Sequence, residues 1–190
     1  LEFYAKMTTY MLMNVPLSYA QSNGYGYIWD NVGTMVNRGV ELNVNATLLQ
    51  IKDFVWSVNA NVGYNHNKLV ELYNGVTEYE LANTNTKLVV GHSVGEFYIN
   101  RYAGVNPANG DALWYDKDGN IVNELRDEDK VLVGKNYHAP WQGGFGTSMN
   151  YKGISLSANF SWVANRWMFN NDRFFEESNG LYSAYNQSKR

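Results

Sequence analysis

The sequence predicts an all-β protein made of antiparallel transmembrane β-barrel strands, joined by short turns at one end and long extracellular loops at the other. Two adjoining runs, 37–50 and 54–67, alternate apolar and polar residues with a period of two. Each apolar stretch matches the ~9–11 residues that a tilted strand needs to cross hydrocarbon. The polar positions are mostly Asn, Ser and Thr, which suit a hydrated lumen better than an outer protein surface.

The composition agrees with this class. The 190 residues are 45% hydrophobic and 15% aromatic, with no cysteine and a formal charge of −3. Mean hydropathy is −0.42 and no stretch approaches 18 apolar residues, so the sequence predicts no transmembrane helix. Lumen-facing polar residues dilute every barrel strand and hide it from such averages. The absence of cysteine excludes disulfides and thiolate metal sites, and the mild negative charge predicts no nucleic-acid partner.

The elements follow in order along the chain. Residues 3–15 form a first candidate strand with blurred alternation, and 16–36 form a loop rich in Gly, Ser, Asn and Tyr. The strands 37–50 and 54–67 turn about Ile51-Lys52-Asp53. Their apolar faces start at Val40 and at Phe54. Glu41 falls on the polar face of its strand.

Residues 68–140 form a long excursion, which is too long to lack structure of its own. Within it, 112–115 and 120–122 flank Lys117-Asp118-Gly119, a hairpin signal because Asp-Gly tolerates positive φ angles. We therefore expect a small sheet there. A second strand pair follows, 142–151 and 153–169, about Tyr151-Lys152-Gly153.

Long loops thus alternate with short turns. In bacterial outer-membrane barrels the turns face the periplasm and the longer loops face outside, which predicts periplasmic turns at 51–53 and 151–153 and extracellular loops at 16–36 and 68–140. No charge falls mid-span on an apolar face, where it would cost ~2–4 kcal/mol. Residues 1–190 are expected to be part of one barrel domain, an internal piece of a longer protein that lacks the terminal strands.

No catalytic, cofactor or metal site is predicted. Asp116, Asp118 and Asn120 alternate as in a calcium loop, but the glycine at 119 is the fourth position and not the sixth, so a plain hairpin turn is expected. The acidic run 124–129 is predicted to be a solvated loop. The three histidines lack metal-ligand spacing, and no nucleophilic serine motif is present. The sequence therefore does not predict an enzyme.

Aromatic residues are the remaining signal. Those near the predicted strand ends are expected to form the interfacial girdles of a barrel: Trp56, Tyr64, Trp141, Tyr151, Trp162 and Trp167. Others lie in the predicted outer loops, where they would either stack against ligand sugars or pack the loops together. The candidate ligand-binding residues among them are Tyr98, Tyr102, Trp114 and Tyr115.

Several short motifs follow one another in the same order as in one protein family. They are Asn31-Val32-Gly33 with Met35 and Asn37-Arg38-Gly39-Val40-Glu41; Tyr64-Asn65 with Asn67-Lys68; Val94-Gly95 with Phe97-Tyr98; Tyr102-Ala103-Gly104-Val105-Asn106-Pro107 with Gly110-Asp111; and Pro140-Trp141 with Gly143-Gly144-Phe145. Tyr4, Lys6, Thr8 and Leu12 match more loosely. This set resembles the SusC/RagA group of TonB-dependent outer-membrane transporters, over nearly the whole chain up to about residue 175.

The resemblance implies a large plugged barrel in the cell outer membrane, whose plug domain is not in this chain. It also implies a SusD-like surface lipoprotein as partner and energy supplied through TonB, which would contact a region outside this chain. The implied function is import of glycans or oligosaccharides, with peptides or oligopeptides as the alternative cargo. From the residues alone, a soluble β-sandwich that binds carbohydrate through its loop aromatics stays open as an alternative.

Overall fold

The computed structural model describes residues 1–16, 20, 26–31, 33–81, 84–177, 184 and 186. A five-stranded wall dominates the described part: β1 (Glu2–Thr9), β4 (Thr34–Ile51), β5 (Phe54–Glu71), β13 (Trp141–Tyr151) and β14 (Ile154–Ala164). Its order is β1-β4-β5-β13-β14, and every neighbouring pair is antiparallel. These strands meander up and down in chain order, as barrel strands do. The predicted all-β class and partial barrel are confirmed, since β1 and β14 are left as open edges.

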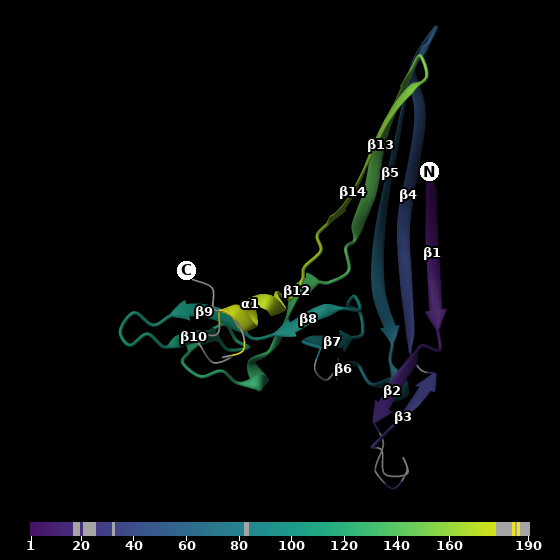
Figure 1. Cartoon of the computed structure of the whole chain (residues 1–190). Helices are drawn as coiled ribbons and strands as arrows, with labels where there is room; N and C mark the ends of the chain where they lie inside the picture. The colour runs from purple at the N-terminus through teal and green to yellow at the C-terminus, as the bar shows by residue number, and fades with distance from the viewer. Residues whose placement is uncertain are drawn as a thin grey trace.

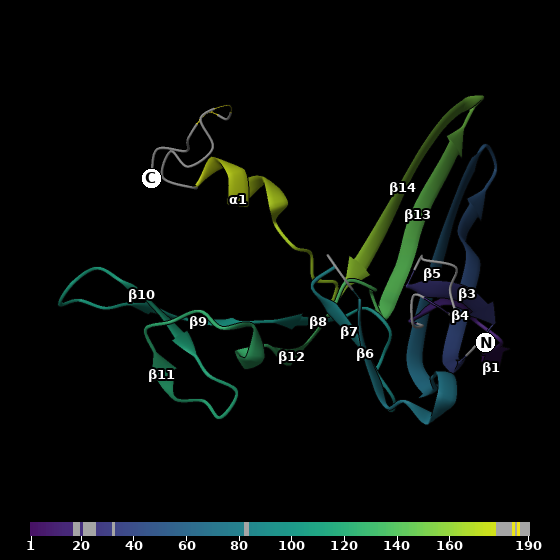
Figure 2. The ribbon, with the colours of Figure 1, turned by 90° about the horizontal axis from the view of Figure 1, so that it is seen from below.

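Smaller sheets gather at the end of the wall opposite the two tight turns (Figure 1). Figure 2 views them from below, together with the short helix α1 (Asn171–Glu176). One sheet pairs β2 (Leu12–Pro16) with β3 (Tyr27–Asn31). A second has the order β12-β8-β7-β6, and its strands are β6 (Glu78–Leu81), β7 (Thr86–Val89), β8 (Glu96–Ile99) and β12 (Val131–Asn136). A third has the order β11-β10-β9, and its strands are β9 (Arg101–Val105), β10 (Ala112–Tyr115) and β11 (Ile121–Val122).

The strand register confirms the two faces of the wall. Val44 pairs with Ala60 and Asn45 with Asn59, so apolar residues stand beside apolar ones and amides beside amides. A bulge at Leu48 keeps the alternation in phase: Thr47 pairs with Ser57, and Leu49 pairs with Trp56. The same alternation continues onto β13 and β14. Large apolar side chains are exposed along this face, among them Leu42, Val44, Phe145, Leu156 and Phe160, as expected of a surface that meets lipid.

The wall extends well past a bilayer. β13 has 11 residues and pairs with β5 from Tyr64 to Phe54. At ~3.3 Å per residue and a tilt of ~40°, this paired part rises ~25 Å, the height of an apolar barrel band. β4 and β5 have 18 residues each, so they continue beyond Val40 and Tyr64 toward the small sheets and exceed the length that a bilayer crossing requires.

Several predicted boundaries were wrong. The strand expected at 3–15 breaks at Tyr10, whose φ is 56°, and β2 leaves the wall to pair with β3 inside the region 16–36 that was expected to be loop. The alternation was blurred because two strands of different sheets adjoin there. The strands expected at 37–50 and 54–67 are longer, 34–51 and 54–71. The strand expected at 153–169 ends at Ala164, before Asn165 at φ 58°.

The excursion carries more structure than the single small sheet expected, since its described residues form two sheets. The predicted hairpin is present: Trp114 pairs with Val122 and Tyr115 with Ile121. A small apolar core joins the excursion to the wall and consists of Met13, Leu69, Leu72 and Leu88. Leu69 of β5 is fully buried, and its backbone bonds to Gly91 and His92. The excursion therefore rests on the end of β5. Among the described residues, no helix has the length and apolar character to span a bilayer.

Candidate functional site at the loop end of the wall

Asparagine side chains form a network on the polar face of the wall, close to its loop end. The amide nitrogens of Asn65 and Asn67 both donate to the side-chain oxygen of Asn37, at 3.2 and 2.9 Å. The Tyr4 hydroxyl donates to the side-chain oxygen of Asn65 at 2.9 Å. Register places Asn37 beside Asn67 and beside Lys6, so three adjoining strands contribute. These hydrogen bonds tie side chains of β1, β4 and β5 together.

Gly39 is required by this arrangement. The Tyr4 ring lies across the backbone at Gly39, and a Cβ there would collide with that ring and with the Tyr64 carbonyl oxygen. An aromatic ring covering a strand glycine in this way pins the register of the two strands. Within the Asn-Arg-Gly motif, Asn37 thus supplies an amide to the network, and Gly39 leaves the space that the Tyr4 ring occupies.

The same network anchors the excursion. The side-chain oxygen of Asn67 accepts from the Val94 backbone N–H at 2.8 Å. Asn136, at the end of β12, donates to the Val94 carbonyl at 2.9 Å and to the Ser93 hydroxyl at 3.1 Å. Residues 93–94 are therefore held from both sides. Motif residues that lie far apart in the sequence meet here, and the sequence alone gave no indication that they would.

A hollow of about 790 Å³ opens over this network. Its lining combines amides with two cations, Lys6 and Arg166, and includes Tyr4, Asn37, Asn65, Gln142 and His138. Such groups can donate hydrogen bonds to hydroxyl, carbonyl or carboxylate oxygens of a passing solute. In the described part of the chain, no three His, Cys, Asp or Glu side chains gather as a metal site would require. The hollow thus presents hydrogen-bond donors and two cations at the loop end of the wall.

The structure separates the predicted ligand-binding aromatics. Tyr102 and Trp114 come together on neighbouring strands, with ring centroids 5.6 Å apart, and Tyr102 is exposed. The Arg101 guanidinium lies 5.4 Å from the Tyr115 ring centre. Tyr98 belongs to the other sheet, where the Lys87 ammonium lies 4.7 Å from its ring centre. The structure thus brings Tyr102 and Trp114 together and places Tyr98 in a separate sheet.

The aromatics at the strand ends fall at two levels. The Tyr64 and Trp141 ring centroids lie 4.6 Å apart at the loop end, and those of Phe54 and Tyr151 lie 6.4 Å apart at the turn end. Trp167 does not join them: it follows the end of β14, its backbone N–H bonds to the Asn136 carbonyl, and its ring lies 4.1 Å from the Lys135 ammonium. The girdle prediction was wrong for Trp167.

The acidic positions act as structural groups. One oxygen of Asp116 accepts from the backbone N–H groups of Asp118 and Asn120 at 2.9 and 2.8 Å, and the other accepts from the Asn120 side chain at 2.9 Å. These hydrogen bonds, the Asn120 side chain first, hold the pKa of Asp116 below its ordinary value. This is the geometry of a hairpin turn.

The prediction that 124–129 is a solvated loop was wrong for Asp129. That side chain is buried, bonds to the Arg126 guanidinium at 2.9 Å, and accepts from the Lys117 backbone N–H. A buried carboxylate with these partners is part of the loop's packing.

Comparison with known proteins decides the family. No family model matches the chain. Among curated proteins it resembles TonB-dependent receptor P26 of Formosa agariphila, with 24% identity over 90% of this chain and 19% of that protein. It also resembles TonB-dependent receptor SusC of Bacteroides thetaiotaomicron, with 25% identity over 87% of this chain and 17% of that protein. A solved structure of the RagAB peptide transporter superposes over 92% of this chain and 20% of its own, with TM-score 0.83 and 35% identity.

The chain belongs to the SusC/RagA family of TonB-dependent transporters. Like these relatives, it is an outer-membrane protein. The RagAB peptide importer in its open-open state matches to the same extent, with TM-score 0.83 and 35% identity. The chain spans about a fifth of the length of the SusC/RagA relatives that it matches. Those relatives are named receptors and transporters, not enzymes.

Proposed function

We propose that this chain forms part of the barrel wall and the outer loops of a TonB-dependent importer. The observation that supports the proposal is the two-faced wall, which has an apolar face of membrane height on one side and an amide-lined face on the other. β1 and β14 lack outer partners among the described strands, and an unpaired edge is not stable in a bilayer. Further strands of a longer polypeptide would close the barrel around a plug.

The longer connections set the proposed orientation. The turns at 51–53 and 151–153 face the periplasm, and the small sheets with the asparagine network face outside. Outer loops and a SusD-like lipoprotein would capture the cargo, and TonB would displace the plug from below. The network then stands at the entrance to the lumen, where its donors meet the cargo first.

We propose oligosaccharides as the cargo because the mid-wall polar face is uncharged. Across the wall, from Asn43 on β4 to Asn159 on β14, the polar face presents amides and hydroxyls. These groups form hydrogen bonds with neutral hydroxyl groups and do not attract ions. The exposed Tyr102–Trp114 pair offers apolar ring faces in the outer loops, suited to sugar rings.

Peptides are the second candidate. The RagAB structures, described as a peptide transporter and importer, support it, and so do Lys6 and Arg166 at the hollow over the network. These cations would bind the carboxylates of peptides.

A deletion strain decides between the cargoes. Growth is measured on defined oligosaccharides and on defined peptides, with the full-length gene or its variants restored. We expect loss of growth on an oligosaccharide, and a several-fold reduction of its uptake when Trp114→Ala is restored. Ile121→Ala, an exposed residue on the neighbouring strand β11, serves as the control. Unchanged uptake of every oligosaccharide, with loss of peptide growth, would replace the first cargo by the second.

Two biochemical observations test the rest. Release of the protein from membranes by high salt without detergent would contradict the barrel and favour the soluble sandwich. A lipoprotein that copurifies with the full-length protein in mild detergent would support the proposed partner, and its absence from a purification that retains uptake activity would contradict it.

A further inference from the structure

Basic side chains gather at one level on the apolar face of the wall. The residues are Arg38 on β4 with His66 and Lys68 on β5. Arg38 and His66 are register partners, and the next outward pair is Val36 and Lys68. All three stand on the loop side of the Tyr64–Trp141 pair. The next acidic residue along β5 is Glu71, which pairs with Thr34 past a bulge and forms no ion pair with these groups.

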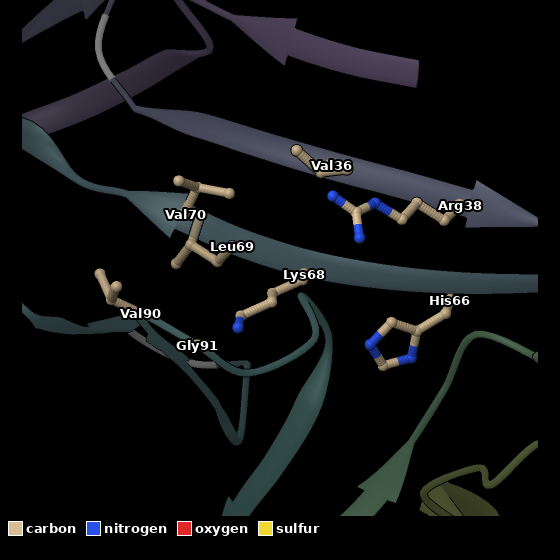
Figure 3. A pocket seen from close by; sticks show the side chains of 8 residues that line it. All are labelled: Val36, Arg38, His66, Lys68, Leu69, Val70, Val90 and Gly91. Carbon is tan, nitrogen blue, oxygen red and sulfur yellow. The ribbon is translucent and has the colours of Figure 1, made fainter. Parts of the chain in front are cut away.

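These groups are exposed and lack acidic partners. Arg38, His66 and Lys68 form no ion pair with any carboxylate in the described residues. Figure 3 shows them around one hollow, with the Arg38 guanidinium between β4 and β5. Neighbouring exposed cations repel one another, so an arrangement without a counter-charge favours an anionic ligand.

The hollow is shaped by both strands and the start of the excursion. Its volume is about 540 Å³, and Val36, Val70 and Val90 line it beside the three basic groups. That size is within the ~300–1,000 Å³ typical of small-molecule sites. Apolar walls beside cations suit a ligand that carries both phosphate and hydrocarbon, whereas a free anion gains nothing from the valines.

The position relative to the membrane identifies such a ligand. Tyr64 and Trp141 mark the interfacial level, and His66 and Lys68 lie ~7 and ~13 Å farther along β5. Lipid phosphates occupy this depth, immediately beyond the hydrocarbon. A guanidinium group binds phosphate through two parallel hydrogen bonds, and a lysine adds a point charge.

We propose that Arg38, His66 and Lys68 bind the phosphorylated headgroup of a membrane lipid at the loop end of the wall. With the orientation proposed above, this is an anionic glycolipid of the outer leaflet. The site is on the lipid side of the wall and takes no part in cargo binding, so it can hold even if the proposed cargo is wrong.

The test uses the full-length protein in nanodiscs of phosphatidylcholine, with or without lipid A, and counts retained lipid A by native mass spectrometry. Removing one charge near an anionic lipid surface lowers binding by about fivefold. We therefore expect Arg38→Gln and Lys68→Gln each to reduce lipid A retention by about fivefold, and the double variant to reduce it further. Arg38→Lys should retain most of the binding.

The matched control is Lys6→Gln, which removes a cation at the same height but on the opposite face. Lys152→Gln removes one at the far end of the wall. Equal losses in either control would overturn the proposal, as would full retention in the double variant or displacement of lipid A by inorganic phosphate alone. Heat-modifiable migration on gels confirms that each variant is folded before its lipids are counted.

Discussion

Single side chains at the loop end hold the wall in register. Gly39 shows this best, because the Tyr4 ring occupies the space above its backbone. We expect Gly39→Ala to lower the free energy of unfolding by ~1–3 kcal/mol, the usual cost of overpacking. Gly63→Ala is the control, since a Cβ there meets its nearest neighbour at 3.7 Å, an ordinary contact. Urea titration of the full-length protein in lipid vesicles measures both, and equal stabilities would contradict the packing argument.

Asp116 makes the 116–120 turn sensitive to acid. Hydrogen bonds to the carboxylate lower its pKa in the folded turn below the ordinary 3.8. A lowered pKa means that the stabilisation is complete above the ordinary value and is lost as the pH falls through the folded pKa. Hydrogen exchange at the amides of Asp118 and Asn120, corrected for intrinsic rates, should therefore accelerate as the pH falls below the ordinary pKa of 3.8.

The control is Asp118→Asn, since the Asp118 carboxylate accepts no hydrogen bond from the described residues. This variant should keep the acid response, whereas Asp116→Asn should remove most of it. An acid response that survives Asp116→Asn would assign the effect to another group.

At the scale of elements, the two faces of a strand should tolerate charge differently. Val44 stands mid-span on the apolar face of β4, and its neighbour Asn43 stands on the polar face. We expect Val44→Arg to cost ~2–4 kcal/mol of folding free energy in a bilayer and Asn43→Arg to cost less, because a charge on the polar face stays hydrated. Folding into vesicles, followed by heat-modifiable migration, measures the difference. A larger cost for Asn43→Arg would reverse the assignment of the faces.

The faces of the wall could be predicted because side-chain alternation is a local property of a strand. The strand ends could not be predicted, because β4 and β5 continue past the length of a bilayer crossing through residues in which apolar and polar side chains no longer alternate. The bend at Tyr10 was equally hidden, because Met7 and Met13 look alike in sequence although they belong to different sheets.

The candidate site was harder to predict than the wall. The sequence marked Asn37, Asn65, Asn67 and Val94 only as parts of motifs, and their meeting depends on β4 and β5 pairing and on residues 93–94 folding back over them. Arg38 and Lys68 were unremarkable for the same reason: a common level on one face depends on the strand register. Patterns along the sequence do not show which residues, tens of positions apart, will pair in the sheet.

At the scale of the whole molecule, the open edges of the wall predict how residues 1–190 behave without the rest of the barrel. Its apolar face is exposed over five strands, and β1 and β14 have no outer neighbour among the described strands. Bilayers do not tolerate such unpaired edges, and in water these edges pair with other chains. Residues 1–190 produced alone should therefore aggregate and show no heat-modifiable band in detergent. The full-length protein should fold under the same conditions. A monomeric, soluble product from residues 1–190 would contradict the barrel wall, because such a face cannot remain in water without a cover.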